Sequence, residues 1–110
     1  MKIGVINFSL LLVALAFGQG YRPPKDGYVP DSYTAVKIAE AVLVPVFGKK
    51  LIESEEPFTA ELKDNVWTVS GTLYCPDGKR AVTTGHCKGG AAVVQVSKVD
   101  ARVISMIHGK

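Results

Sequence analysis

The stretch that decides the fold is residues 57–73, which read PFTAELKDNVWTVSGTL. Apolar and polar residues alternate along both halves of it, and Asp64-Asn65 stands between the halves as a turn. The apolar positions are Phe58, Ala60 and Leu62, then Trp67, Val69, Gly71 and Leu73. A period of two is typical of strands with one buried face. The stretch therefore predicts an antiparallel hairpin with one apolar and one polar face, and with Trp67 in the core.

Two more strands are expected downstream of this hairpin. Residues 74–90 are rich in Gly, Pro, Asp and Lys, which is typical of a loop. Ala91 to Ser97 then predicts a third strand, Val99-Asp100-Ala101 a tight turn, and Arg102 to Ile107 a fourth strand.

Upstream of the hairpin, the periodicity is that of a helix. Asp31 is a candidate N-cap, because its carboxylate can accept from free backbone N–H groups of a first turn. Apolar residues at steps of three and four then form a core-facing stripe: Ala35, Val36, Ala39, Val42, Leu43 and Val46. Pro45 lacks an N–H, so it should kink or loosen the last turn before Gly48 ends the helix.

Residues 49–56 form a charged connector, with a short extended piece expected at Leu51-Ile52. The carboxylates of Glu53, Glu55 and Glu56 are interpreted as a solvated charge run. Together the elements predict the α+β class: one N-terminal helix packed on an antiparallel sheet of three to four strands.

The N-terminus has the pattern of a secretory signal peptide. Lys2 precedes an apolar run from Ile3 to Phe17, and small residues follow at Gly18 and Gly20. We expect a leader over residues 1–18, cleaved after Gly18 or alternatively after Gly20. A retained membrane anchor is the competing interpretation, but the run is shorter than the roughly 18–20 apolar residues that a spanning helix needs.

The expected mature chain is small. Residues 19–30, with several Pro and Gly, predict an extended lead-in on the surface, and residues 31–110 a single α+β domain. A chain of about 90 residues buries only about 60–65% of its unfolded surface, so a covalent cross-link would help it. The expected localisation is the periplasm or the extracellular medium.

Cys75 and Cys87 are the only two cysteines. An even cysteine count in an exported chain favours a disulfide between them. Half of a metal site, with His86 beside Cys87, is the alternative. Zinc needs three or four ligands at suitable spacing, and the one other histidine, His108, is far along the chain. The disulfide is preferred, and no metal is expected.

Catalytic patterns are missing from the sequence. Ser70 lies in a strand pattern rather than in a strained Gly-x-Ser-x-Gly turn, and Gly89-Gly90 merely precedes a strand. No catalytic residue and no cofactor are expected. The net charge of +3 falls to +2 once Lys2 is removed, which is too mild to imply a nucleic-acid partner. No membrane association is expected after cleavage of the leader.

Binding is better supported than catalysis. The loop closed by the expected disulfide carries an aromatic residue and cationic groups on a fixed frame, and these are the candidate partner-binding residues: Tyr74, Lys79, Arg80, His86 and Lys88. The alternative is that a small exported domain simply displays a polar loop.

The helix and strands together carry a family resemblance. Its segments are Pro30-Asp31, residues 34–41, Pro45-Val46-Phe47-Gly48, Pro57-Phe58, Leu62, residues 64–73, Gly89-Gly90 and residues 107–110. This set resembles a bacterial immunity-protein family with a nuclear transport factor 2-like fold, linked to polymorphic toxin systems. The strand around Trp67 that ends in Gly-Thr-Leu and the closing His-Gly-Lys are the more specific parts. The cysteine-closed loop between Gly-Thr-Leu and Gly-Gly departs from the family pattern.

The resemblance implies a curved, cone-like sheet with a helix in its mouth. It also implies a non-enzymatic protein that neutralises a cognate toxin by stoichiometric binding. Two alternatives stay open: a secreted or periplasmic inhibitor of another protein, such as a hydrolase, and a small ligand-binding protein or enzyme that uses the cone as its pocket. A toxin-like neighbouring gene, a captured hydrolase or a deep polar pocket would separate the three.

Overall fold

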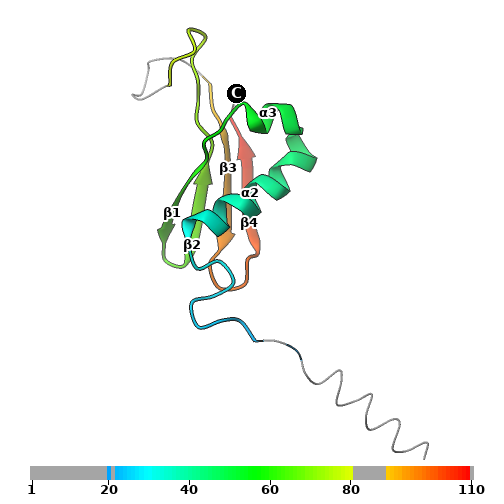
Figure 1. Cartoon of the computed structure of the whole chain (residues 1–110), viewed down its shortest axis with the longest axis vertical. Helices are drawn as coiled ribbons and strands as arrows, with labels where there is room; N and C mark the ends of the chain where they lie inside the picture. Colours follow the sequence, from blue (N-terminus) through cyan, green and yellow to red (C-terminus); the bar gives the residue numbers. More distant parts are fainter. Residues whose placement is uncertain (1–19, 21, 81–88, 110) are drawn as a thin grey trace, which may run out of the picture.

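The structure, a computed structural model, describes residues 20, 22–80 and 89–109 of the chain (Figure 1). The expected leader over residues 1–18 lies outside the described residues. So do His86, Cys87 and Lys88 of the expected disulfide and contact loop. The leader, its cleavage and the disulfide therefore stay predictions.

Four strands form one antiparallel sheet, in which each strand pairs with the next one along the chain. The strands are β1 Thr59–Lys63, β2 Val66–Ser70, β3 Ala92–Ser97 and β4 Val103–His108. The expected hairpin and both later strands are confirmed. In this order β1 and β4 are the two edges of the sheet.

The turn between β1 and β2 fixes the register of the hairpin. Asp64 and Asn65 have φ values of 50° and 61°, in the left-handed region that two-residue hairpin turns need. The turn pairs Leu62 with Trp67 and Ala60 with Val69. Trp67 and Val69 are thereby directed into the core, as expected, and both are buried. Leu62 was expected in the core too, but it is 44% exposed, because it lies on an edge strand beside the turn.

Helix α2, Ser32–Phe47, crosses one face of the sheet and contacts β1, β2 and β3 (Figure 1). Its first turn is capped as predicted: the Asp31 carboxylate accepts from the Thr34 N–H at 2.8 Å. Ala35, Ala39 and Leu43 are fully buried against the sheet. The α+β class, with an N-terminal helix packed on a four-stranded antiparallel sheet, is confirmed. No helix in the described part of the chain is long and apolar enough to cross a membrane.

The end of α2 differs from the expectation. Val46 was placed in the core-facing stripe, but it is 59% exposed. In this last turn Phe47 rather than Val46 is directed inward, and its ring lies 5.2 Å from the His108 ring of β4. Pro45 is accommodated inside the helix, and Gly48, with φ 95°, ends it.

A second helix replaces the expected connector. Residues Lys49–Glu53 form α3, so the extended piece expected at Leu51-Ile52 is wrong. The reason is burial: a helical turn directs Ile52, 1% exposed, into the core and leaves Leu51 outside. The chain leaves α3 through Ser54 and Glu55, and Pro57 follows a cis peptide bond.

The lead-in is partly buried, which corrects the prediction that residues 19–30 lie on the surface. Val29 is fully buried, and its backbone oxygen accepts from the Trp67 indole N–H at 2.8 Å. The N–H groups of Tyr28 and Val29 donate to the backbone oxygens of Val99 and Lys98. The buried indole needs an acceptor, and this part of the lead-in supplies it.

Candidate functional site

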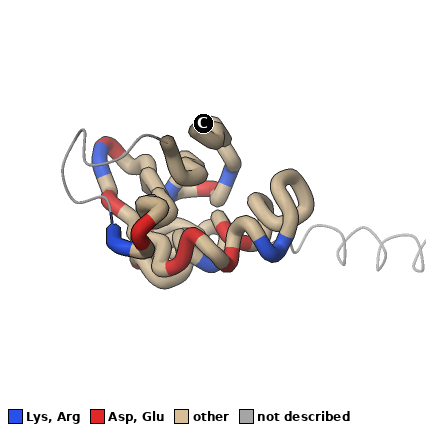
Figure 2. The backbone as a smooth tube through the Cα atoms, turned by 90° about the horizontal axis from the view of Figure 1, so that it is seen from above, with Lys and Arg blue, Asp and Glu red and all other residues tan. Residues whose placement is uncertain are grey.

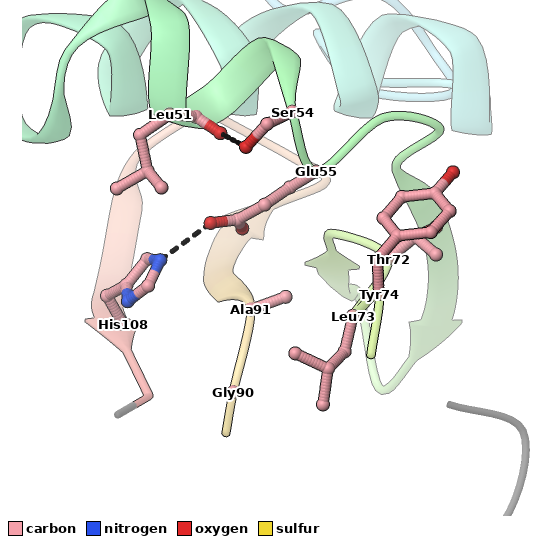
Figure 3. A pocket seen from close by; sticks show the side chains of 9 residues that line it. All are labelled: Leu51, Ser54, Glu55, Thr72, Leu73, Tyr74, Gly90, Ala91 and His108. Carbon is pink, nitrogen blue, oxygen red and sulfur yellow. Dashed lines mark hydrogen bonds and ion pairs between the residues drawn. The ribbon is translucent and has the colours of Figure 1, made fainter. Parts of the chain in front are cut away.

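Glu55 is the central residue of the site and corrects the sequence interpretation most clearly. It was assigned to a solvated charge run, yet its side chain is only 9% exposed. One carboxylate oxygen, Oε1, accepts from the Ala92 N–H at 2.7 Å. The other, Oε2, lies 2.6 Å from Nε2 of His108 (Figure 3). A buried carboxylate requires such partners, because desolvation without them is costly.

Glu55 joins the end of β2 to the start of β3. Its backbone oxygen accepts from the Thr72 N–H at 2.7 Å, while its carboxylate accepts from Ala92 at the first position of β3. A direct bond from the Gly71 N–H to the Ala92 oxygen, 2.9 Å long, completes the connection. The segment after α3 is therefore fixed to the end of the sheet by main-chain and side-chain bonds together.

His108 is held at both ring nitrogens. Nδ1 lies 2.6 Å from the backbone oxygen of Gly109, and Nε2 faces the Glu55 carboxylate. The Gly109 oxygen can only accept, so Nδ1 carries a hydrogen, and with Glu55 as a carboxylate Nε2 donates as well and the ring is an imidazolium. The hydrogen bond to Glu55 raises the pKa of His108 above its ordinary value, burial opposes this, and the bond to Gly109 adds to it. The site is thus a partly buried ion pair.

Three glycines create the space for this ion pair. A Cβ on Gly71 would lie 2.8 Å from Oε1 of Glu55 and 3.0 Å from the Phe58 ring. Gly90 and Gly109 approach each other so closely that a Cβ on Gly90 would lie 2.7 Å from the Gly109 Cα. Side chains at these positions would displace Glu55 or separate the start of β3 from the end of β4.

A pocket of about 310 Å³ opens beside the ion pair, between α3 and the ends of the strands (Figure 3). Leu51, Leu73 and Ala91 supply apolar wall, and Ser54 and Thr72 supply hydroxyl groups. Ser54 donates to the Leu51 oxygen and Thr72 to the Pro57 oxygen. Neither hydroxyl is paired with a base, and His108 has no free nitrogen to act as one. The arrangement favours structural support and binding over catalysis.

The structure brings together those predicted contact residues that it describes. Tyr74 and Arg80 pair across a short turn, and the Cys75 N–H donates to the Lys79 oxygen at 2.7 Å. The Tyr74 hydroxyl donates to the backbone oxygen of Glu56, which ties the loop base to the segment that carries Glu55. Lys79 and Arg80 are exposed on a loop that projects beyond the end of the sheet (Figure 1).

Sequence reasoning missed the Glu55–His108 pair, although a signal existed. In β4 the period of two places His108 on the same face as Met106, which packs against the core. A histidine at an inward position needs a polar partner. The partner itself carried no signal, because Glu55 stands among other glutamates in a short segment with no visible periodicity.

One long helix lies on a four-stranded antiparallel meander, and Gly71, Gly90 and Gly109 gather at one end of it, which defines a small α+β domain. The family described as NTF2 fold immunity protein matches residues 34–110, and the chain belongs to this family. The suspected resemblance is confirmed.

A curated relative is the uncharacterized protein YhhH of Escherichia coli (strain K12). It is 24% identical over 82 residues, which are 74% of this chain and 58% of the relative. The chain therefore spans little more than half of that relative's length. No solved structure is a significant match to this chain.

Proposed function

We propose that this protein is an immunity protein that neutralises a cognate bacterial toxin by binding it stoichiometrically. The observation that carries the proposal is the family match over residues 34–110. The site supports a role without turnover, because both nitrogens of His108 are occupied by acceptors and the nearby hydroxyls donate to backbone oxygens. The fold then serves to present a surface.

The proposal places the protein in the periplasm or outside the cell, on the basis of the leader pattern in residues 1–18. The projecting loop is proposed as part of the contact. Of its described residues, Tyr74 and Arg80 are of types that interfaces favour, and Lys79 adds a second cation. Cations at the rim of an interface act chiefly on the association rate.

The test first searches the genes beside this one for a toxin-like domain, and then uses that domain, purified with its active site inactivated. A 1:1 complex in light scattering, together with survival of cells that export both the active toxin and this protein, is the expected result. The proposal fails if the toxin domain does not bind, or if substoichiometric amounts of this protein protect by converting the toxin. If a pull-down with this protein captured a hydrolase in place of the toxin, this protein would instead be an inhibitor of another protein.

A further inference from the structure

The corner between α2 and α3 is hollowed and apolar. Gly48, with φ 95°, turns the chain there between the two helices. A cavity of about 590 Å³ lies on this corner, lined by Phe47, Gly48, Lys49, Lys50, Leu51 and Ser54. Leu51 is 41% exposed on its wall, while its neighbour Ile52 is buried and anchors α3 to the core. The cavity therefore offers apolar surface on a fixed support.

The cavity carries positive charge without a counter-ion. Among the described residues, ion pairs within 4.0 Å form at Arg102–Asp100 and His108–Glu55, and neither Lys49 nor Lys50 takes part in one. Lys49 lines both this cavity and a neighbouring hollow, which Glu40 and Glu53 line as well. Of these two hollows, Lys50 lines the corner cavity only. Figure 2 shows Lys and Arg segments interspersed with Asp and Glu segments over the backbone, so the two adjacent lysines of the corner are a local feature and not part of a basic face.

The corner is continuous with the Glu55–His108 site. Leu51 and Ser54 line both the corner cavity and the pocket beside the ion pair, and Tyr74 of the projecting loop lines that pocket too. Phe47 forms the corner wall on one side and contacts the His108 ring on the other. A wall that is already formed before binding lowers the entropy lost on binding.

We infer that this corner is the apolar centre of the toxin contact, and that it receives an apolar or aromatic toxin side chain flanked by carboxylates. This inference rests on the proposed function and adds to it the chemistry of the toxin surface. The apolar side chain enters the cavity against Phe47 and Leu51, and a carboxylate beside it pairs with Lys50. The projecting loop then forms the cationic rim around a buried apolar centre, as interfaces are commonly arranged.

The experiment compares two double variants that make the same change at two places. Lys50→Glu/Leu51→Ala alters the corner. Leu62→Ala/Lys63→Glu alters a Leu-Lys pair on edge strand β1, where Leu62 is 44% exposed against 41% for Leu51. Circular dichroism and urea unfolding first establish that both variants fold. The probe is the inactivated toxin domain described above, and its dissociation constant is measured by calorimetry at two salt concentrations.

We expect the corner variant to bind about tenfold more weakly or worse, and the β1 variant to bind within about twofold of the wild type. The loss at the corner should be larger at low salt, because the reversed charge then repels the toxin carboxylate most strongly. Equal affinity of a folded corner variant and the wild type would overturn the inference while leaving the proposed function intact. A wild type that does not bind the toxin domain would overturn both.

Discussion

At the scale of single residues, the Glu55–His108 pair connects parts of the chain that are 53 positions apart. Glu55 belongs to the segment after α3, His108 closes β4, and Ala92 begins β3. Such a pair is sensitive to the loss of either partner, since a partly buried charge left alone is strongly destabilising. Its contribution to the fold should therefore depend on pH.

The first prediction concerns this pH dependence. The pKa of His108 is raised in the folded state above the ordinary 6.5 of an unfolded histidine. The stabilisation is therefore fully present below about pH 6.5 and is lost as the pH rises through the folded pKa. Glu55→Gln should lower the free energy of unfolding by about 2 kcal/mol at pH 6, and by less at pH 9. Urea unfolding at several pH values measures both effects.

The control for this prediction is Glu53→Gln, two residues away on the exposed side of α3. It removes the same charge without touching His108, so its unfolding free energy should follow the wild-type pH profile. If the free energy of unfolding of Glu55→Gln changed between pH 6 and pH 9 as much as that of the wild type, the Glu55–His108 pair would not be the cause of the pH dependence.

The residue scale is also where sequence reasoning was least complete. The N-cap at Asp31 and the buried position of Trp67 were predicted, because a capping carboxylate and a period of two are local signals. The pairing of Glu55 with His108 is a long-range event. No local pattern distinguishes the buried glutamate from Glu53 and Glu56, which are exposed.

At the scale of elements, α2 and the four strands were predictable because each is long enough to show its period. Helix α3 was not, since five residues cover little more than one helical turn and show no repeating stripe. The side of α2 that is buried was predicted up to Leu43. Its last turn, where Phe47 replaces Val46 on the inner side, depends on β4 and could not be seen locally.

The second prediction concerns Pro45 inside α2. Proline lacks the N–H that would bond the Ala41 oxygen, and its ring crowds that carbonyl. Pro45→Ala should restore the bond and raise the free energy of unfolding by about 1–2 kcal/mol, part of the gain being offset by the freer unfolded chain. Thermal and urea unfolding measure the change.

Ser32→Ala, at an exposed position of the same helix, is the control and should change stability by less than about 0.5 kcal/mol. A Pro45→Ala variant less stable than the wild type would mean that the proline ring supports the packing around α3 more than it harms the helix.

At the scale of the whole molecule, the α+β class was predictable and the corner cavity was not. The order of periodic segments determines the class, one helix followed by a meander. The corner cavity arises where α2 and α3 meet, and Gly48 with its positive φ makes that meeting possible. Such a junction exists only once the tertiary structure has formed.

The third prediction is that Cys75 and Cys87 are joined in the exported protein, which follows from the leader pattern and the even cysteine count. Protein recovered from the periplasm or the medium should begin at Gln19 or Tyr21 by intact mass. Thiol labelling of the denatured, unreduced sample should find no free thiol. Replacing both cysteines by serine should lower the free energy of unfolding by about 3 kcal/mol, the value for a loop of about 13 residues.

Two results would contradict this prediction. A mass that retained residues 1–18 would show that the leader is not removed. Two labelled thiols per chain would show that the cysteines are not joined. The control compares the serine variant with the wild type after reduction. The cross-link is then absent from both proteins, so their free energies of unfolding should agree.

The position of His108 in the last strand also has a consequence for how the chain is made. During synthesis Glu55 leaves the ribosome 53 residues before the imidazole that pairs with it, and β3 emerges before the strand that covers its open side. A nascent chain that stops short of β4 has a carboxylate without its cation and an apolar strand with an exposed edge. The native sheet, with its Glu55–His108 pair, can therefore be completed only after β4 has been translated.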